Sequence, residues 1–203
     1  MKDLVVLVPD KNVKFAIDGL LSRFDSLNIN KINYEIFIHP LRDSGVYCYA
    51  SEFLRSFIKL YSYALVFLDL EGSGQEKELP DMVAEKIKRE IEINGWKNRG
   101  DVIVFNPELE IWVWVESLHT ARALGWDNYQ ELKEWLVKKN VWTINTPKPK
   151  GPKEAMEDAL KIKRIPRSSS LYLEIAQKVS LNKCQDGSFA KFREILSRWF
   201  PKK

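Results

Sequence analysis

The sequence is poor in cysteine and histidine and has no long apolar run. Its 203 residues include two cysteines and two histidines. Cys48 and Cys184 lie far apart and outside the spacings typical of a zinc site or a disulfide framework, so we expect two reduced thiols. No apolar run approaches the roughly 18 residues that a bilayer-spanning helix needs, and the run after Met1 is too short for a signal peptide. These absences favour a cytoplasmic protein without a membrane partner.

Internal repeats and low-complexity tracts are also missing. With 45% hydrophobic and 30% charged residues, the chain has enough apolar surface to fold into an ordered core. A length of 203 residues suits one large domain, or a core with a smaller helical appendage.

Short apolar runs alternate with segments of helical spacing through the first half of the chain. The runs predict buried β-strands at residues 4–8, 34–39, 63–68 and 102–105. The segments between them predict helices at residues 13–24, 47–60 and 80–94, and Asn106-Pro107-Glu108 is typical of a further helix start. This order predicts an α/β fold with a parallel sheet of about four strands flanked by helices.

Strand patterns fade after Trp112, and the rest of the chain predicts helices. These are expected at residues 118–124, 129–139, 152–163, 168–179 and 188–200. The proline-rich segment that begins at Thr146 predicts a linker. We therefore expect an α/β core over residues 1–146 and a basic helical C-terminal extension, residues 147–203, packed on that core.

Charge is distributed unevenly along the chain. The net charge is +4, but residues 147–203 hold 14 Lys and Arg against 6 Asp and Glu, and the preceding part holds 18 against 22. A basic part that attracts phosphate, beside an acidic part that holds cations, suits a protein that acts on a polyanion. A solvated, lysine-rich helical face would give the same balance, so both interpretations stay open.

Acidic residues follow three of the four predicted strands. Asp10 follows the first, Asp69 and Glu71 the third, and Glu108 and Glu110 the fourth. Ligands of open parallel sheets bind beyond the carboxyl ends of the strands, so we expect these carboxylates to share one crevice. Their mutual repulsion would be relieved by Mg²⁺ or Mn²⁺, which prefers oxygen ligands. Turn and helix-cap roles are the alternative.

The same segments resemble the TOPRIM-like proteins found among prokaryotic defence genes and mobile elements. The acid after the first strand, VFLDLEG at the third, PELEIWVW and the later GPKEAMEDAL carry the resemblance, which covers about residues 4–160. More narrowly, the chain is similar to small proteins of methylation-associated phage-defence systems, in which LVxDKN and ELEIWVW segments occur. The resemblance implies a TOPRIM-like fold that uses Mg²⁺ for phosphoryl transfer.

The family pattern has a glutamate after the first strand, Asp-x-Asp at the third, and Glu-x-Glu-x-Trp opening the next helix. Carried over, it implies catalytic roles for Asp10, Asp69, Glu71 and Glu110, and it implies metal ligation by Asp69, Glu71, Glu108 and Glu110. Two departures stand out, because Asp10 is shorter than the family glutamate and Glu71 replaces an aspartate. These departures favour an alternative in which the fold is kept and the catalysis is lost.

Basic residues are the candidates for contact with nucleic acid. Lys11 lies beside Asp10, where an ammonium could stabilise charge on a phosphate. Lys163, Arg164 and Arg167 belong to the densest basic stretch of the tail and could contact phosphates. A solvated lysine and a positively charged loop are the alternatives.

Histidine and tryptophan provide four further candidates. His39 follows the second strand and His119 the tryptophan-rich segment, and each could act as an acid or base or fill a structural or surface role. Trp112 and Trp114 would face different directions on a helix, so one is expected in the core and the other could line the crevice. The segment from Gly72 to Gly74 lacks a phosphate-binding signature and predicts a flexible loop.

The sequence therefore predicts a TOPRIM-like nuclease or related phosphoryl-transfer protein, dependent on Mg²⁺ or Mn²⁺, that acts on nucleic acid in defence against foreign DNA. One alternative is a catalytically inactive subunit of a defence complex with partner proteins. Another is a sequence-independent nucleic-acid binder that uses the basic tail. Metal-dependent cleavage supports the nuclease, and salt-dependent binding without cleavage indicates the binder.

Overall fold

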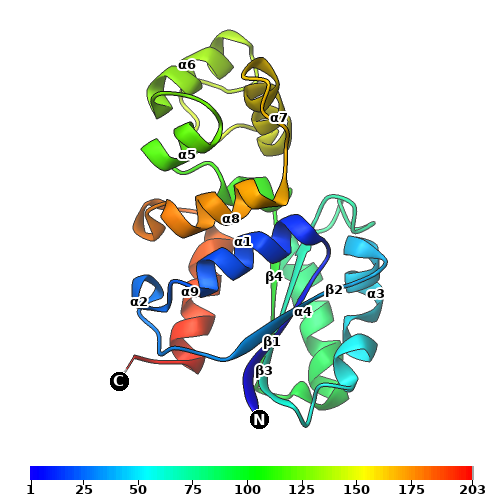
Figure 1. Ribbon diagram of the computed structural model, residues 1–203. Helices are drawn as coiled ribbons and strands as arrows, with labels where there is room; N and C mark the ends of the chain where they lie inside the picture. Colours follow the sequence, from blue (N-terminus) through cyan, green and yellow to red (C-terminus); the bar gives the residue numbers. More distant parts are fainter. Residues whose placement is uncertain (203) are drawn as a thin grey trace.

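The computed structural model describes residues 1–202 as helices around a four-stranded sheet (Figure 1). In chain order the elements are β1 (Lys2–Val8), α1 (Lys11–Leu21), α2 (Phe24–Leu27), β2 (Tyr34–Ile38), α3 (Arg42–Arg55), β3 (Tyr61–Asp69), α4 (Pro80–Ile91), η1 (Glu92–Trp96), β4 (Gly100–Phe105), η2 (Leu109–Trp112), α5 (Leu118–Ala123), α6 (Tyr129–Lys138), α7 (Pro152–Ile162), α8 (Ser169–Lys178), η3 (Leu181–Lys183) and α9 (Gly187–Trp199). Every strand pair is parallel, in the order β2-β1-β3-β4. None of these helices has both the length and the apolar character that crossing a bilayer demands.

Alternation along the strands produces two hydrophobic layers, one on each face of the sheet. In β1, Leu4, Val6 and Val8 join a core cluster that includes apolar residues of α1, α8 and α9. Val5 and Leu7 belong to a second cluster with residues of α3 and α4. All five side chains are fully buried. A strand buried on both faces needs an unbroken apolar run, which explains why the strand signals in this sequence are continuous.

This architecture confirms an α/β fold with a four-stranded parallel sheet, flanking helices and a helical C-terminal part, and it is consistent with a TOPRIM-like fold. Each strand begins and ends within two residues of its predicted limits.

The predicted limits of the helix at residues 47–60 are wrong. The observed α3 begins at Arg42 and ends at Arg55, so it starts directly beside the exit of β2. Gly45 allows this close approach, because a Cβ there would lie 2.3 Å from Nδ1 of His39. The sequence Asp-Ser-Gly at residues 43–45 is typical of a turn, so the first turn of this helix was not predicted. Phe57 belongs to the turn into β3, where its carbonyl accepts from the backbone N–H of Tyr61 at 3.1 Å.

The helix start expected at Asn106-Pro107-Glu108 is also wrong. Glu108 is extended, with φ −155° and ψ 171°, and only the short 3₁₀ turn η2 follows it. Trp112 and Trp114 are 7% and 2% exposed, and their indole N–H groups donate to Ser188 Oγ at 2.7 Å and to the Pro152 carbonyl at 2.9 Å. Both are therefore core residues, and the crevice role considered for one of them is not met.

The last two long helices complete the main core. In Figure 1, α8 lies along α1, while α5, α6 and α7 form a separate lobe beyond this pair. Arg23, after α1, donates to the carbonyls of Ala176 and Val179, each at 2.8 Å, and so ties α1 to the end of α8. Trp199 of α9 stacks on Tyr63 of β3 with 4.7 Å between ring centroids. Residues of the predicted C-terminal extension thus pack directly on the sheet.

Close packing of α1 on α8 depends on Gly19, where a Cβ would lie 2.8 Å from Ala176 Cβ and 3.0 Å from the Leu173 carbonyl oxygen. We expect Gly19→Ala to lower the free energy of unfolding by about 1–2 kcal/mol, because overpacking outweighs the gain in helix propensity. Gly187→Ala is the matched control, since nothing lies within 4 Å of a Cβ there. Urea denaturation measures both variants, and an unchanged Gly19→Ala protein would show that the two helices can separate without cost.

Candidate functional site at the carboxyl edge of the sheet

A polar cleft of about 980 Å³ opens at the carboxyl edge of the sheet. The loops after the strands form one side of it, and Lys153 of α7 and Arg167, just before α8, line it as well. The predicted site residues that line this cleft are Asp10, Lys11, His39, Asp69, Glu71, Glu108, Glu110 and Arg167. All five predicted acids therefore share one crevice.

The first acid of the cleft combines two roles that the sequence left as alternatives. Asp10 precedes α1 and accepts the backbone N–H of Val13 at 3.0 Å through Oδ1, so it is the N-cap of that helix. It also lines the cleft, as does the neighbouring Lys11. Capping therefore fixes the position of the Asp10 side chain at the cleft.

Hydrogen bonds to backbone groups join the exits of β3 and β4. Asp69 Oδ1 accepts the N–H of Leu109 at 2.9 Å, which joins the exits of β3 and β4. The N–H of Glu71 donates to the Pro107 carbonyl at 3.0 Å and ties the same two loops again. The N–H groups of Gly72 and Gly74 donate to Glu76 Oε1, so this loop already holds an acidic side chain of its own.

Asp43 is a sixth acid in the cleft, and sequence reasoning missed it. It lies in the first turn of α3, and its Oδ1 accepts the backbone N–H of Asp69 at 2.7 Å. The sequence signal was its position four residues after His39, but the late helix start expected there made Asp43 look like a loop residue. Asp43 brings a carboxylate from the β2 exit to the acids of β1 and β3.

Crowding of these acids changes their ionisation. Burial raises the pKa of Asp69 well above its ordinary value, and the negative charges of Asp43, Glu110 and Asp10 raise it further. Burial likewise raises the pKa of Asp43 to about 6, with a further contribution from Asp10, although the hydrogen bond from the Asp69 N–H opposes the rise. Asp69 and Asp43 are therefore difficult to ionise together.

The two glutamates after β4 are paired with cations from the C-terminal part of the chain. Glu108, 5% exposed, accepts from Lys153 Nζ at 2.9 Å, yet burial still raises its pKa. Glu110, 2% exposed, accepts from the Arg167 guanidinium and from the Tyr172 hydroxyl. Lys153 lies in the Pro-Lys-Glu-Ala element noticed in the sequence, but no local signal pointed to Tyr172.

The other acids of the cleft have no such partner. Across residues 1–202, no Lys, Arg or His nitrogen lies within 4.0 Å of the carboxylates of Asp10, Asp43, Asp69 and Glu71. Six acids line the cleft against four basic residues. The cleft therefore carries an excess of negative charge on the side formed by the first three strand exits.

His39 contributes a buried ring to the cleft wall. It is 5% exposed, and its Nδ1 accepts the backbone N–H of Leu41 at 3.2 Å. Burial lowers the pKa of His39, which favours the neutral imidazole. Of the two predicted histidines, only His39 lines the cleft, and His119 lies in α5 of the separate lobe.

Two of the predicted nucleic-acid residues lie outside the cleft. Lys163 is exposed at the end of α7, with Nζ 4.2 Å from the ring centroid of Trp126. Arg164 is exposed and left-handed, with φ 56°. Arg167, in contrast, turns into the cleft. The basic stretch is thus divided between a solvent face and the acidic site.

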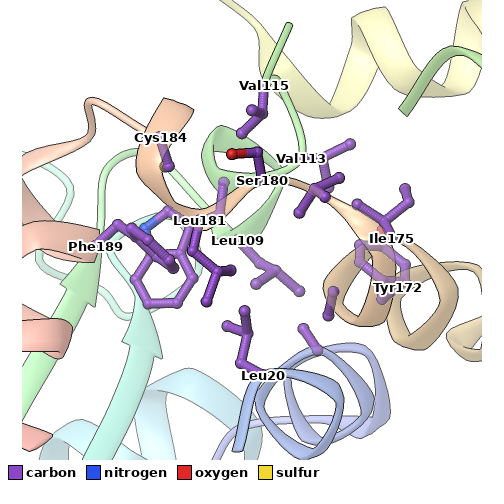
Figure 2. A pocket seen from close by; sticks show the side chains of 14 residues that line it. Leu20, Leu109, Val113, Val115, Tyr172, Ile175, Ser180, Leu181, Cys184 and Phe189 are labelled. Carbon is purple, nitrogen blue, oxygen red and sulfur yellow. The ribbon is translucent and has the colours of Figure 1, made fainter. Parts of the chain in front are cut away.

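A small apolar cavity adjoins the acidic cleft (Figure 2). Its volume is about 30 Å³, and Leu20, Ile175 and Leu181 are among the side chains around it. Leu109 lines both this cavity and the cleft, and Tyr172 lines the cavity while its hydroxyl reaches Glu110. Glu110 therefore lies where the polar cleft meets the apolar core, which strengthens its interaction with Arg167.

The donor chemistry of the cleft suits a hard divalent cation, because six carboxylates supply only oxygen. Within residues 1–202, no three His, Cys, Asp or Glu side chains are already arranged as a metal site. Lys153 and Arg167 instead place positive charge at Glu108 and Glu110. These two side chains neutralise part of the negative charge of the cleft.

Fold and site define a parallel α/β protein with an acidic cleft at its strand exits. Comparison of the chain with protein-family models, curated proteins and solved structures found no match.

The raised pKa of Asp43 predicts a pH effect on stability. Folding favours the protonated acid, so this stabilisation is complete below about pH 4 and is lost as the pH rises through about 6. Asp43→Asn keeps an oxygen for the Asp69 N–H but cannot ionise. The free energy of unfolding of Asp43→Asn minus that of the unmodified protein should therefore increase by about 1–3 kcal/mol between pH 4 and pH 7.

Urea denaturation in EDTA across this pH range measures the difference. Glu52→Gln, at an exposed position of the same helix, is the matched control for loss of one negative charge. A stability difference between Asp43→Asn and the unmodified protein that stays constant with pH would contradict the raised pKa of Asp43, which results from burial and from the charge of Asp10.

Proposed function

We propose that this chain is a TOPRIM-like phosphoryl-transfer protein, dependent on Mg²⁺ or Mn²⁺, that cleaves nucleic acid in defence against foreign DNA. The observation that carries the proposal is the gathering of Asp10, Asp43 and Asp69 at the carboxyl edge of the sheet, where no cationic nitrogen of residues 1–202 lies within 4.0 Å of them. Such an arrangement is costly unless protons or a cation neutralise it. The resemblance of the sequence segments to TOPRIM-like proteins supports the choice of reaction.

Asp69, Glu71 and Glu110 would hold the cation, with Asp10 as a further ligand or general base and Glu108 beside them; Asp69 already accepts the backbone N–H of Leu109, which lies between the two glutamates. A bound divalent ion would activate a water molecule and neutralise the charge that develops on the phosphate. Asp10 and Asp69 are oriented by their backbone hydrogen bonds to Val13 and Leu109. Fixed acceptors of this kind keep their geometry during the reaction and so lower its reorganisation cost.

Basic side chains would receive the phosphate backbone. Lys11 and Lys153 line the cleft, and the ammonium of Lys153 is 2.9 Å from Glu108. Lys163 and Arg164 lie outside the cleft, exposed at the end of α7, and would offer further positive charge to a long polyanion. This arrangement supports nucleic acid, rather than a small phosphate ester alone, as the substrate class.

A second candidate is a subunit without catalytic activity that binds nucleic acid or partner proteins of a defence complex. The observation that favours it is the pairing of Glu108 with Lys153 and of Glu110 with Arg167, which leaves neither glutamate free for a metal. The shorter Asp10 and the Glu71 replacement point in the same direction. If this second function is correct, the two ion pairs have a structural role and are not displaced by a metal ion.

Asp69→Asn tests the metal site. In EDTA the variant should melt at the same or a higher temperature, because one repulsive charge is removed while an oxygen still accepts the Leu109 N–H. Mn²⁺ should raise the melting temperature of the unmodified protein and have little effect on the variant. Cleavage of DNA or RNA should fall by more than about tenfold, the scale found even for residues that only support metal ligands.

Differential scanning fluorimetry and a gel assay provide these measurements, with Glu85→Gln on the exposed side of α4 as the control. An equal rise in melting temperature with Mn²⁺ for Asp69→Asn and the unmodified protein would refute a metal site at Asp69. A metal response without cleavage of any nucleic acid would favour the second candidate.

The paired substitution Lys163→Gln with Arg164→Gln tests the nucleic-acid surface. Affinity should fall equally for all sequences, and the slope of log affinity against log salt should become shallower by up to about 0.9 per lost duplex phosphate contact. Lys59→Gln with Lys97→Gln removes the same charge at the amino edge of the sheet and is the control. Fluorescence anisotropy over a salt series compares them, and superimposable curves would exclude Lys163 and Arg164 from binding.

A further inference from the structure

We propose that Arg167 is a counter-ion switch, which neutralises Glu110 until a divalent cation arrives and is then released to bind a substrate phosphate. This inference rests on the proposed function and adds an order to it, with the cation bound first and the phosphate second. It gives Arg167 a positioning and gating role rather than a role in the chemical step.

The contacts of Arg167 are those of a side chain held in place by acids. Its guanidinium donates to Glu110, and another of its nitrogens donates to Glu157 at 2.8 Å. Its Nε donates to the Tyr172 hydroxyl at 2.7 Å, and that hydroxyl in turn donates to the same oxygen of Glu110, Oε1. The direct contact and the contact through Tyr172 thus converge on one oxygen of Glu110, while the third contact pairs the guanidinium with Glu157.

Competition between Arg167 and a cation follows from the burial of Glu110. This carboxylate is 2% exposed, so water screens little of the charge around it. A divalent ion at Glu110 would bring two positive charges next to the guanidinium. The repulsion favours departure of Arg167, whose side chain is 28% exposed and therefore has solvent-accessible space beside it.

The charge balance of the cleft sets the order of binding. Six acids against four basic residues repel a phosphate as long as no cation is present. Once a cation neutralises the acids, the released guanidinium offers a fork of N–H donors that matches phosphate oxygens. Arg167 lies in the short segment between α7 and α8, directly at the cleft, so a change of side-chain rotamer is enough to move it.

Mn²⁺ titration by calorimetry tests the competition. Arg167→Gln should bind Mn²⁺ about tenfold more tightly than the unmodified protein, because a competing charge-assisted hydrogen bond is removed. Arg167→Lys keeps the charge but loses the fork of contacts, so its affinity should lie between the two. Arg89→Gln, at an exposed position of α4 outside the cleft, should leave the affinity unchanged.

This direction separates a switch from a purely structural residue. Loss of stability is expected in both cases, because Glu110 is buried and would lose its partner. A structural Arg167 would leave the Mn²⁺ affinity equal or weaker in the folded variant, and that result would overturn the switch. If Arg167→Gln does not fold, Arg167→Lys decides in the same way.

Binding of a phosphorothioate DNA 12-mer, followed by anisotropy in EDTA and in Mn²⁺, tests the second half of the proposal. The unmodified protein should bind at least tenfold more tightly in Mn²⁺, and Arg167→Gln should lose most of this gain although it binds the metal better. Equal gains in the two proteins would overturn the release of Arg167 to phosphate. An unmodified protein that binds no Mn²⁺ would instead refute the proposed function, and the switch with it.

Discussion

Repulsion between carboxylates at the carboxyl edge of the sheet is the constraint on which the rest of this structure depends. Parallel strands bring their exits to one side, so acids far apart in sequence, such as Asp10 and Asp69, meet there by topology. Backbone N–H groups of Val13 and Leu109 hold them in place. Because the cluster is costly, its protonation state affects the stability of the protein.

The C-terminal part of the chain neutralises some of this negative charge. Its helices cover one face of the sheet, and it also delivers Lys153 and Arg167 to the two glutamates after β4. The same segment therefore builds the hydrophobic core and sets the charge of the cleft. Two basic residues of the tail are therefore found in the acidic cleft, whereas others, such as Lys163 and Arg164, face solvent.

Strand positions and the place of the acids could be predicted from the sequence, because buried parallel strands have continuous apolar runs and their exits have fixed locations. The start of α3, and with it Asp43, could not, since Asp-Ser-Gly resembles a turn and the close packing of Gly45 on His39 has no local signal in the sequence. The partners of Glu110 were equally hidden. Tyr172 is 62 residues away, and no periodicity reports a contact of that range.

Tyr172 joins two environments that are usually separate, with its ring against the apolar cavity and its hydroxyl on Glu110. Phenylalanine would fill the same volume but leave the carboxylate one donor short, whereas a smaller polar residue would keep a donor and leave the core underfilled. The position is thus constrained twice over, by shape and by polarity. During divergence it would change only together with Glu110 or Arg167, so these three positions should evolve as a unit.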